Sequence, residues 1–469
     1  MSSYTISPTL NKSRVFILPK SELEKRFDPM YYAHEYNHYD KQLSKKPFKK
    51  FHQILKSINN GYDFRDYKES GTPYLKVANV KQGELDFTKI QYIDFNSSEI
   101  SKNIQLKKGN LLLTRKGTFG NAFALDKDYD FVISSEVFYI ELQDNSINPK
   151  FLEIFFNSKI GQAQFDKNKI GAIMGSLSQE AIRDLKIPLP SSEIQNQIVG
   201  IYESYVAQKQ KNEAEANKLL SSIDDYLLKE LGIKLPEPPE NTLKNRMFVT
   251  NISELSGNRY DPNYHQKFFQ DVFSAFEKGK YEYSQIRKYA SFQAGYAFKS
   301  SDYLEQSNCL LITIKNIRQN QIDIEDATYL PDDFFEQYKE FQIRNNDLLI
   351  AMTGATIGKV GIYNHPNNSL LNQRNGIIKP DNINSIYLMS LLNLSIFQKL
   401  ILRNSNGGAQ PNISETDIMR ISIPVPPLDK QKEIAEHITS IRQQAQQLKD
   451  KTKELLKKAS EEIERILLN

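Results

Sequence analysis

The sequence has too few cysteines and histidines for several common kinds of protein. Cys309 is the one cysteine in 469 residues, which excludes a disulfide framework. The six histidines are scattered and lack the spacing that a zinc site needs, and tryptophan is absent. We therefore expect no structural metal and no disulfide-stabilised fold.

Long apolar runs are absent as well. No stretch approaches the roughly 20 residues that cross a bilayer, and the N-terminus MSSYTISPTLNKSRVF lacks the continuous apolar segment of a signal peptide. With 39% hydrophobic residues, the chain is nevertheless long enough for two or three domains, each with its own core. These features predict a globular, cytoplasmic protein.

The charge of the chain is close to balanced. A formal net charge of +4 excludes a polybasic, histone-like protein and says little by itself about partners. The 25 tyrosines and 26 phenylalanines are interleaved with lysine, arginine, asparagine and glutamine, as on surfaces that meet nucleic acid. Most of these aromatic residues are nevertheless expected in the core.

The sequence does contain a long internal repeat. RFDPMYY (26 to 32) returns as RYDPNYH (259 to 265), and NNGYDF (59 to 64) returns as QAGYAF (293 to 298). A repeat of this length predicts one supersecondary plan built twice. Three further pairs of segments correspond: PYLKVANVKQGELD (73 to 86) with LLITIKNIRQNQID (310 to 323), NLLLTRKGTFGNAFAL (110 to 125) with DLLIAMTGATIGKVGI (347 to 362), and GAIMGSLSQEAIRDLKIPLP (171 to 190) with GGAQPNISETDIMRISIPVP (407 to 426).

Each copy continues from IPLP or IPVP into a long helical pattern. Apolar or small residues recur four and three apart, which is a heptad seam and predicts two long helices that pack antiparallel against each other. We expect these helices at 191 to 230 and 428 to 469, with a proline-rich linker at 231 to 242. The seam residues are Ile194, Ile198, Ile201, Tyr205, Ala216, Leu219, Ile223 and Tyr226 in the first helix, and Ile434, Ile438, Ile441, Ala445, Leu448, Thr452, Leu455 and Ala459 in the second.

Before each helix, the repeat reads mainly as strands. KGNLLLTRKGTFGNAFAL gives an apolar strand, a glycine turn and a second strand, and QIRNNDLLIAMTGATIGKVGIY repeats that pattern. The predicted fold is therefore α+β, with two pseudo-repeated globular domains separated by two long helices that form an antiparallel coiled coil.

Two enzyme classes fit the motifs poorly. Asp-Pro-x-Tyr resembles the (Asp/Asn)-Pro-Pro-Tyr loop of amino-methyltransferases, but Met30 and Asn263 replace the second proline, and neither half has Gly-x-Gly after a first strand. Asp66-Tyr67-Lys68 lacks the upstream acidic partner of a metal-dependent nuclease. We therefore assign no catalytic residues, and interpret Asp28-Pro29 and Asp261-Pro262 as helix starts.

Polar and glycine-rich segments are the better functional candidates. Glycine lets backbone approach a ligand closely, and Arg, Lys, Asn, Gln and Thr side chains can contact phosphates or base edges. The alternative interpretation is ordinary hairpin turns with solvated charges. The candidate DNA-binding residues are Lys76, Asn79, Lys81, Arg115, Lys116, Thr118, Asn121, Lys167, Lys169, Lys315, Asn316, Arg318, Thr353, Thr356, Lys359, Arg403, Asn406 and Gln410.

Taken together, these motifs resemble the specificity subunit of type I restriction-modification systems, from about residue 20 to 469. The most specific part is Ile187-Pro188-x-Pro190 followed by Gln195, repeated as Ile423-Pro424-x-Pro426 followed by Gln431. GAIMGSLS in the first copy departs from GGAQPNIS in the second, so its polar loop is the less typical.

The resemblance implies a noncatalytic DNA-recognition subunit with two target recognition domains, at 1 to 190 and 243 to 427. Each domain would read one half of a split, asymmetric DNA target, with the helices as spacer. Two methyltransferase (modification) subunits would bind the helices, and restriction/translocase subunits would bind that core. S-adenosylmethionine, ATP and magnesium would then lie on partner subunits, with no cofactor on this chain. The candidate partner-binding residues are Gln195, Ile198, Gln431, Ile434 and Ile438.

Three other functions stay open at the level of the sequence. One is a single-chain DNA methyltransferase, which predicts cofactor binding by this chain alone. Another is a coiled-coil scaffold that binds only proteins. The last is the specificity subunit of a different restriction class, in which one partner fuses the nuclease and the methyltransferase.

Overall fold

The computed structural model divides the chain into two compact units. Unit 1 comprises Met1–Asn212 and Asp450–Asn469, and unit 2 comprises Glu213–Lys449. Each unit therefore contains residues from both copies of the repeat. The residues that the structure describes are 7, 10, 15–23, 27, 29–32, 34–94, 106–143, 146–170, 175–240, 242–249, 262, 264–405 and 411–468.

Unit 1 is built on a four-stranded antiparallel sheet in the order β2-β10-β7-β8. A second sheet has the order β6-β3-β9, and two smaller ladders pair β4 with β5 and β1 with β11. The strands are β1 (Phe48–Lys50), β2 (Leu55–Asn60), β3 (Thr72–Leu75), β4 (Val80–Lys81), β5 (Glu84–Leu85), β6 (Gln91–Ile93), β7 (Leu111–Thr114), β8 (Ala122–Ala124), β9 (Val132–Ile133), β10 (Val137–Leu142) and β11 (Lys186–Pro188). The helices are α1 (His34–Leu43), α2 (Pro149–Asn157), α3 (Lys159–Asn168), α4 (Gln179–Arg183) and the first part of α5 (Ser192–Leu231).

Unit 2 repeats this topology strand for strand. Its sheets have the orders β13-β21-β18-β19 and β17-β14-β20, with the ladders β15-β16 and β12-β22. The strands are β12 (Tyr283–Gln285), β13 (Ala290–Ala294), β14 (Cys309–Ile312), β15 (Ile317–Arg318), β16 (Gln321–Ile322), β17 (Thr328–Leu330), β18 (Leu348–Ala351), β19 (Val360–Ile362), β20 (Asn368–Leu371), β21 (Asn375–Pro380) and β22 (Ser422–Pro424). The helices are α6 (Leu243–Arg246), α7 (Lys267–Glu277), α8 (Phe334–Gln337), α9 (Ser385–Leu392), α10 (Ser395–Asn404), α11 (Glu415–Met419) and the first part of α12 (Leu428–Leu468). The predicted duplication is confirmed.

The continuous apolar strands reflect sheets that are covered on both faces. In β7, Leu111 and Leu113 join the core formed with α2, whereas Leu112 joins a second core with Val80 of β4. In unit 2, Leu348 and Leu349 divide in the same way between two cores. Because both faces are buried, these strands show no alternation of apolar and polar residues. Every residue of β7 and β18 is buried.

The first helices of the two copies differ from the helix starts that the Asp-Pro pairs predict. Pro29 does begin a short 3-10 helix, Pro29–Tyr32, but the first α-helices of the two copies, α1 and α7, begin five residues after each proline, at His34 and Lys267. Asp28 and Asp261 lie outside the described residues.

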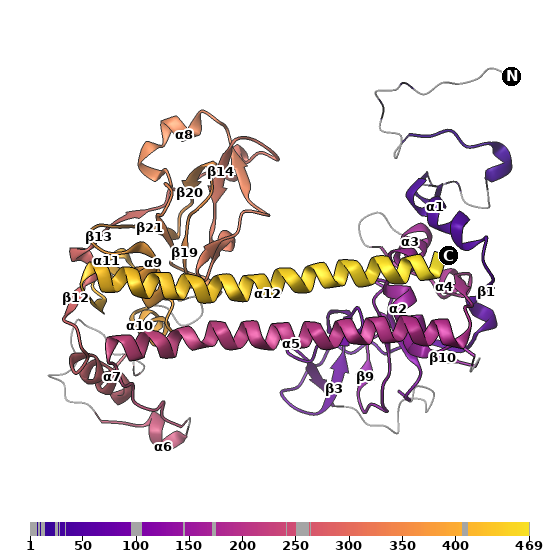
Figure 1. The fold of residues 1–469 in the computed structure, drawn as a ribbon, viewed down its shortest axis with the longest axis horizontal. Helices are drawn as coiled ribbons and strands as arrows, with labels where there is room; N and C mark the ends of the chain where they lie inside the picture. Colours follow the sequence, from indigo (N-terminus) through magenta and orange to yellow (C-terminus); the bar gives the residue numbers. More distant parts are fainter. Residues whose placement is uncertain are drawn as a thin grey trace. The chain divides into compact units, whose positions relative to one another are not determined.

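In unit 1, the first part of α5 packs antiparallel against the last part of α12. Ile198, near the start of α5, shares a core with Ile463 and Leu467, near the end of α12. Farther along α5, Asn212 Nδ2 donates a hydrogen bond to Thr452 Oγ1 at 3.0 Å, and both residues are buried. The two segments lie side by side in Figure 1, with α5 in magenta and α12 in yellow.

In unit 2, the last part of α5 packs antiparallel against the first part of α12. The Tyr226 ring lies 4.1 Å from the His437 ring, and Glu230 Oε2 lies 2.7 Å from Lys430 Nζ. The seam residues Ile434 and Ile438 are fully buried. The predicted antiparallel pairing is thus confirmed within each unit. The helices span Ser192–Leu231 and Leu428–Leu468, compared with the expected 191 to 230 and 428 to 469.

A short hairpin in each unit docks on a long helix. In unit 2, Nη2 of Arg442 on α12 donates to Asn320 Oδ1 at 2.6 Å and to Ser390 Oγ at 3.1 Å, which ties the β15-β16 turn to the helix. Burial lowers the pKa of Arg442 to about 10. In unit 1, the β4-β5 turn approaches α5 so closely that a Cβ at Gly83 would lie 2.1 Å from the Tyr202 hydroxyl.

The repeated glutamines join each globule to its helix. Gln195 Oε1 accepts from Asn148 N at 2.8 Å, and its Nε2 donates to the Ser146 and Pro190 carbonyls. Gln431 Oε1 accepts from Asn384 N at 2.9 Å, and its Nε2 donates to the Pro426 carbonyl at 2.8 Å. Both glutamines are buried.

The predicted partner-binding residues all have a place inside the chain's own fold, because the glutamines bond within their own unit and the isoleucines lie in the cores. They are Gln195, Ile198, Gln431, Ile434 and Ile438, all between 0% and 3% exposed. Their contact with a methyltransferase subunit stays a prediction.

We predict that Gln431→Ala loosens the joint of unit 2. The substitution leaves the Asn384 N–H and the Pro426 carbonyl without their partner, and an unsatisfied buried group costs about 1 to 3 kcal/mol. Hydrogen exchange of the Asn384 amide should therefore accelerate by roughly tenfold or more. Gln443→Ala, at an exposed position of the same helix, is the matched control and should leave the rate unchanged. Equal rates in both variants would contradict the role of Gln431.

Candidate nucleic-acid interface

Four loops meet at the end of β7 in unit 1, and we name them loop cluster 1. They are the glycine turn 115 to 120, the turn 134 to 136, the loop 61 to 64, and residues 176 and 177. Arg115 N donates to the Glu136 carbonyl at 2.9 Å, Leu177 N donates to the Arg115 carbonyl at 2.8 Å, and Ser135 N donates to the Tyr62 carbonyl at 2.9 Å. Backbone hydrogen bonds thus hold all four loops together.

Unit 2 repeats this arrangement as loop cluster 2. It comprises the glycine turn 352 to 359, the turn 372 to 374, the loop 295 to 298, and residues 411 to 413. Met352 N donates to the Arg374 carbonyl at 3.0 Å, Ile413 N donates to the Met352 carbonyl at 3.0 Å, and Gln373 N donates to the Tyr296 carbonyl at 2.8 Å. The same three hydrogen bonds therefore recur in both units.

The glycine turns need glycine at both positions. Gly117 and Gly354 have φ of 72° and 70°, and Gly120 and Gly358 have φ of 87° and 81°, a region that other residues adopt at a cost. A Cβ at Gly117 or Gly354 would meet open space, so the first glycine of each turn leaves its backbone accessible. A Cβ at Gly120 would instead lie 2.9 Å from the Phe165 ring of α3. Each turn is therefore fixed at one end and open at the other.

A pair of amide side chains braces each glycine turn from behind. Gln162 Nε2 donates to the Gly120 carbonyl at 2.8 Å, and Asn157 holds both the N–H and the carbonyl of Ala122. In unit 2, Gln398 and Asn393 bond Gly358 and Val360 in the same way. Sequence reasoning missed these four residues, although their shared position in the repeat is a signal that could have found them.

Loop cluster 1 carries positive charge at its surface. Lys116 is exposed, and Arg115 is half-buried with its guanidinium 5.1 Å from the centre of the Phe138 ring. The Arg115 Nε is buried and has no hydrogen-bond partner among the described residues. Lys169 lies close by, with Nζ 3.1 Å from Asp166 Oδ1 and 5.8 Å from the Phe119 ring centre. An arginine with free donors can take a phosphate or a guanine edge.

The structure separates the candidate DNA-binding residues into three groups. Arg115, Lys116 and Thr118 lie in loop cluster 1, and Thr353, Thr356 and Lys359 lie in loop cluster 2. A second group lies on or beside the hairpins that dock on the helices: Lys76, Asn79, Lys81, Lys315, Asn316 and Arg318. The third group is scattered: Asn121 directly precedes β8, Lys167 and Lys169 lie at the end of α3, Arg403 is on α10, and Asn406 and Gln410 lie outside the described residues.

Some of these residues have structural roles in the fold, and DNA contact by their side chains stays a prediction. Asn79 Oδ1 accepts from Lys76 N at 2.9 Å while its Nδ2 donates to the Asp86 carbonyl at 2.8 Å. Asn316 makes the same pair of bonds in unit 2. Asn121 Nδ2 donates to the Val80 carbonyl, and Thr353 is buried where its backbone pairs with Asn412. The exposed fraction of these four residues is between 2% and 9%.

Two cations are also used inside the fold. Lys167 is 8% exposed, and its Nζ lies 3.1 Å from Asp40 Oδ2. Burial of Asp40 opposes ionisation, but hydrogen bonds from Lys186 and Lys167 hold the pKa of the carboxyl below its ordinary value. Arg403 Nε donates to the Tyr264 carbonyl at 2.7 Å, with the guanidinium 3.8 Å from the Tyr264 ring centre. Both cations therefore have partners within the fold, and their contact with DNA stays a prediction.

A family of known proteins shares this chain's sequence pattern. The sequence profile described as "Type I restriction modification DNA specificity domain" matches the chain twice, at residues 43–221 and 278–458. The chain belongs to this family.

Several relatives align with nearly the whole chain. It is 24% identical over 418 residues to the type I restriction enzyme MjaVIII specificity subunit of Methanocaldococcus jannaschii, covering 87% of this chain and 90% of that protein. It is 20% identical over 392 residues to the EcoBI specificity subunit of Escherichia coli, covering 82% and 77%. A solved structure concerned with complex assembly and conformational transition of the type I R-M system shares the fold, with a TM-score of 0.51, 14% identity, and coverage of 90% of this chain and 97% of that one.

Each match to the specificity-domain family contains one complete loop cluster. The segment 43–221 includes loop cluster 1 and the first part of α5, and 278–458 includes loop cluster 2 and most of α12. The family's unit of sequence is thus one globule together with its helix.

Sequence reasoning missed the turns that precede β10 and β21, at 134 to 136 and 372 to 374. Glu136 in cluster 1 and Arg374 in cluster 2 occupy equivalent places, because each carbonyl accepts from the first residue of the glycine turn. Tyr62 and Tyr296 are visible in the aligned NNGYDF and QAGYAF motifs, which is a signal that could have found the neighbouring loop. The turn itself lies where the copies share no residues, so alignment gives no signal there.

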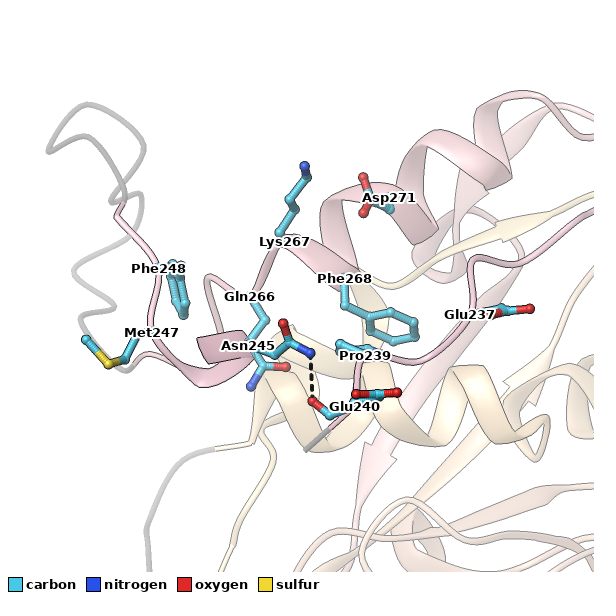
Figure 2. A pocket seen from close by; sticks show the side chains of 10 residues that line it. All are labelled: Glu237, Pro239, Glu240, Asn245, Met247, Phe248, Gln266, Lys267, Phe268 and Asp271. Carbon is cyan, nitrogen blue, oxygen red and sulfur yellow. Dashed lines mark hydrogen bonds between the residues drawn. The ribbon is translucent and has the colours of Figure 1, made fainter. Parts of the chain in front are cut away.

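A pocket in unit 2 lies apart from loop cluster 2. Figure 2 shows that it is lined from the linker after α5, from α6 and from α7, and its volume is about 530 Å³. Its charged lining is Glu237, Glu240, Asp271 and a single lysine, Lys267. An excess of carboxylates repels phosphates. The pocket is therefore a poor DNA site.

Neither metal chemistry nor a membrane span is indicated by the described residues. Their His, Cys, Asp and Glu side chains form no group of three that could hold a metal ion. No single helix within them is long and apolar enough to cross a membrane, and α9 and α10 pass that test only together, as a pair bent by 69°.

Proposed function

We propose that the chain is the DNA-recognition subunit of a type I restriction-modification complex and that it reads a bipartite, asymmetric target. The observation that carries this proposal is the duplicated loop cluster, which offers two independent reading surfaces on one chain. The first target recognition domain is 1 to 190 and the second is 243 to 427. The helices at 191 to 230 and 428 to 469, with the linker at 231 to 242, are the spacer between them.

The two clusters differ in the residues that they present. Cluster 1 has Arg115 and Lys116 in its glycine turn, whereas cluster 2 has Met352 and Thr353 at those positions. Surfaces that differ in charge and hydrogen-bond donors select different base pairs. An asymmetric target, with unlike halves, follows from this difference.

The side chains that remain candidates for DNA contact are those that the fold leaves accessible. Phosphate contacts supply affinity and orientation, and base contacts supply specificity. The exposed candidates are Lys81, Lys116, Thr118, Lys315 and Arg318, and the half-buried ones are Lys76, Arg115, Lys169, Thr356 and Lys359.

The chemistry of the complex lies on its partners. Two methyltransferase (modification) subunits bind the helices and methylate adenine N6 with S-adenosylmethionine, and restriction/translocase subunits use ATP and magnesium. This chain supplies the target sequence and the distance between its halves, and needs no cofactor. Because the DNA is that of the cell and its invaders, the complex acts in the cytoplasm.

A domain exchange tests the proposal most directly. Replacing residues 20 to 188 with the first domain of another family member should change one half of the methylated motif, because each cluster reads alone. The other half and the spacer length should be retained. The motif is read by mapping methylated adenines in cells that carry the complete complex. An exchange that altered both halves together would contradict independent reading.

Charge removal in cluster 1 tests the role of its glycine turn. We expect Arg115→Ala with Lys116→Ala to weaken methylation governed by the first half-site, while Lys359→Ala affects only the second. If these residues read bases, discrimination at one or two base pairs falls by about 1 to 3 kcal/mol for each bidentate pair removed. If they bind phosphate, affinity falls for all sequences and the salt slope shrinks by about one per residue. Filter binding of the whole complex at several salt concentrations distinguishes these outcomes, and an unchanged affinity and motif would remove the turn from the interface.

A further inference from the structure

The turns before β10 and β21, at 134 to 136 and 372 to 374, carry side chains of opposite charge at equivalent positions. The Glu136 carbonyl accepts from Arg115 N at 2.9 Å, and the Arg374 carbonyl accepts from Met352 N at 3.0 Å. The preceding residues, Ser135 and Gln373, both donate to the tyrosine of the neighbouring loop. The backbone of the two turns is therefore equivalent, while the side chains are a carboxylate in unit 1 and a guanidinium in unit 2.

The backbone of Arg374 adopts an unfavourable conformation. Its φ is 67°, and the other non-glycine residues with positive φ in the described part of the chain are Asn320, Asn346 and Asn382. Asparagine enters this region readily, but a long side chain does so at a cost. Such outliers persist where the surrounding structure enforces them, and they gather at functional sites.

A buried asparagine enforces the shape of this turn. Asn375 is fully buried, and its Nδ2 donates to the carbonyls of Asn372 and Gln373 at 3.2 and 3.3 Å. Gln373 N also donates to Asn372 Oδ1 at 2.8 Å. The amide network leaves Gln373 and Arg374 exposed at the surface of loop cluster 2.

The Arg374 guanidinium is not used by the fold. Within the described residues it makes no hydrogen bond and no ion pair, and the same holds for the Glu136 carboxylate. In each cluster, one arginine lies where the glycine turn meets the turn before β10 or β21. In cluster 1 this is Arg115, on the glycine turn. In cluster 2 it is Arg374, on the turn 372 to 374, so this turn supplies the donor that the glycine turn lacks at Met352.

We propose that Glu136 and Arg374 are specificity-determining residues at equivalent positions of the two target recognition domains. Arg374 donates to O6 and N7 of a guanine in the half-site read by unit 2. Glu136 accepts from the exocyclic amino group of a cytosine or adenine in the other half-site. These pairings follow from the donors and acceptors that base edges present in the major groove. The proposal rests on the proposed function and names the residues that carry it.

Arg374→Gly and Arg374→Lys test the assignment in the complete complex, with the methylated motif as the measurement. Glycine suits the positive φ, so the first variant removes the side chain without straining the turn. Lysine keeps the charge but loses the planar fork that binds guanine in a bidentate manner. Both variants should lose discrimination at the same single base pair of one half-site, by roughly 5- to 150-fold. The other half and the spacer should stay unchanged, and Glu136→Gln should alter one base pair in that other half.

Arg287→Ala is the matched control, since Arg287 is exposed and lies outside loop cluster 2. It should reproduce the wild-type motif. The proposal is overturned if both Arg374 variants keep the wild-type motif. It is also overturned if lysine restores full methylation while glycine weakens it evenly at all sequences, because Arg374 then only anchors phosphate. A wild-type complex without a bipartite motif would instead refute the proposed function itself, so the two failures are distinguishable.

Discussion

Burial of one apolar stripe on each long helix holds the two units of this chain together internally. Neither stripe can be left in water, since apolar surface gains about 25 cal/mol for each Å² that it buries. The seam of each copy's helix is covered by the helix of the other copy, so residues 450–469 complete unit 1 and residues 213–231 complete unit 2. Neither copy of the repeat therefore forms a complete core without the other. The buried Asn212–Thr452 hydrogen bond adds a polar contact of the kind that fixes helix register.

Successive polar contacts extend from the helices to the loops. Gln195 and Gln431 attach each globule to its own helix, and Arg442 adds a second attachment in unit 2 through the β15-β16 turn. Amide side chains on α2 and α3, and on α10 and just after α9, then brace the strands that carry the glycine turns. Side chains on loops held in this way lose little freedom when a ligand binds, which favours specificity.

Much of this plan could be predicted from the sequence, because repetition and periodicity are properties of the sequence itself. The duplication, the heptad seam at Ile434 and Ile438, and the strand-turn-strand motifs around Gly117 and Gly354 are all visible there. The roles of individual polar residues are not. The sequence does not distinguish an asparagine that caps a 3-10 turn, such as Asn79, from one that could bind an adenine edge. The burial of the side chain in the structure makes this distinction.

Where the two copies must differ in function, they also differ in sequence. Glu136 and Arg374 share a position that only backbone hydrogen bonds reveal, because the surrounding residues have diverged. Conversely, Gln195 and Gln431 occupy equivalent positions of the repeat, which suggests a binding site. In the structure, each forms the hydrogen bonds that connect its globule to its helix. In this chain, similarity between the copies marks the scaffold, and divergence marks the turns for which we propose a role in target selection.

Independent reading of two half-sites by one chain is tested by mapping methylated adenines across the genome of a host with and without this gene. We expect a motif that disappears with the gene. That motif should consist of two short, unlike specified halves separated by a constant number of unspecified base pairs. A continuous motif without a spacer, two identical halves, or a motif that persists when the gene is deleted would contradict it.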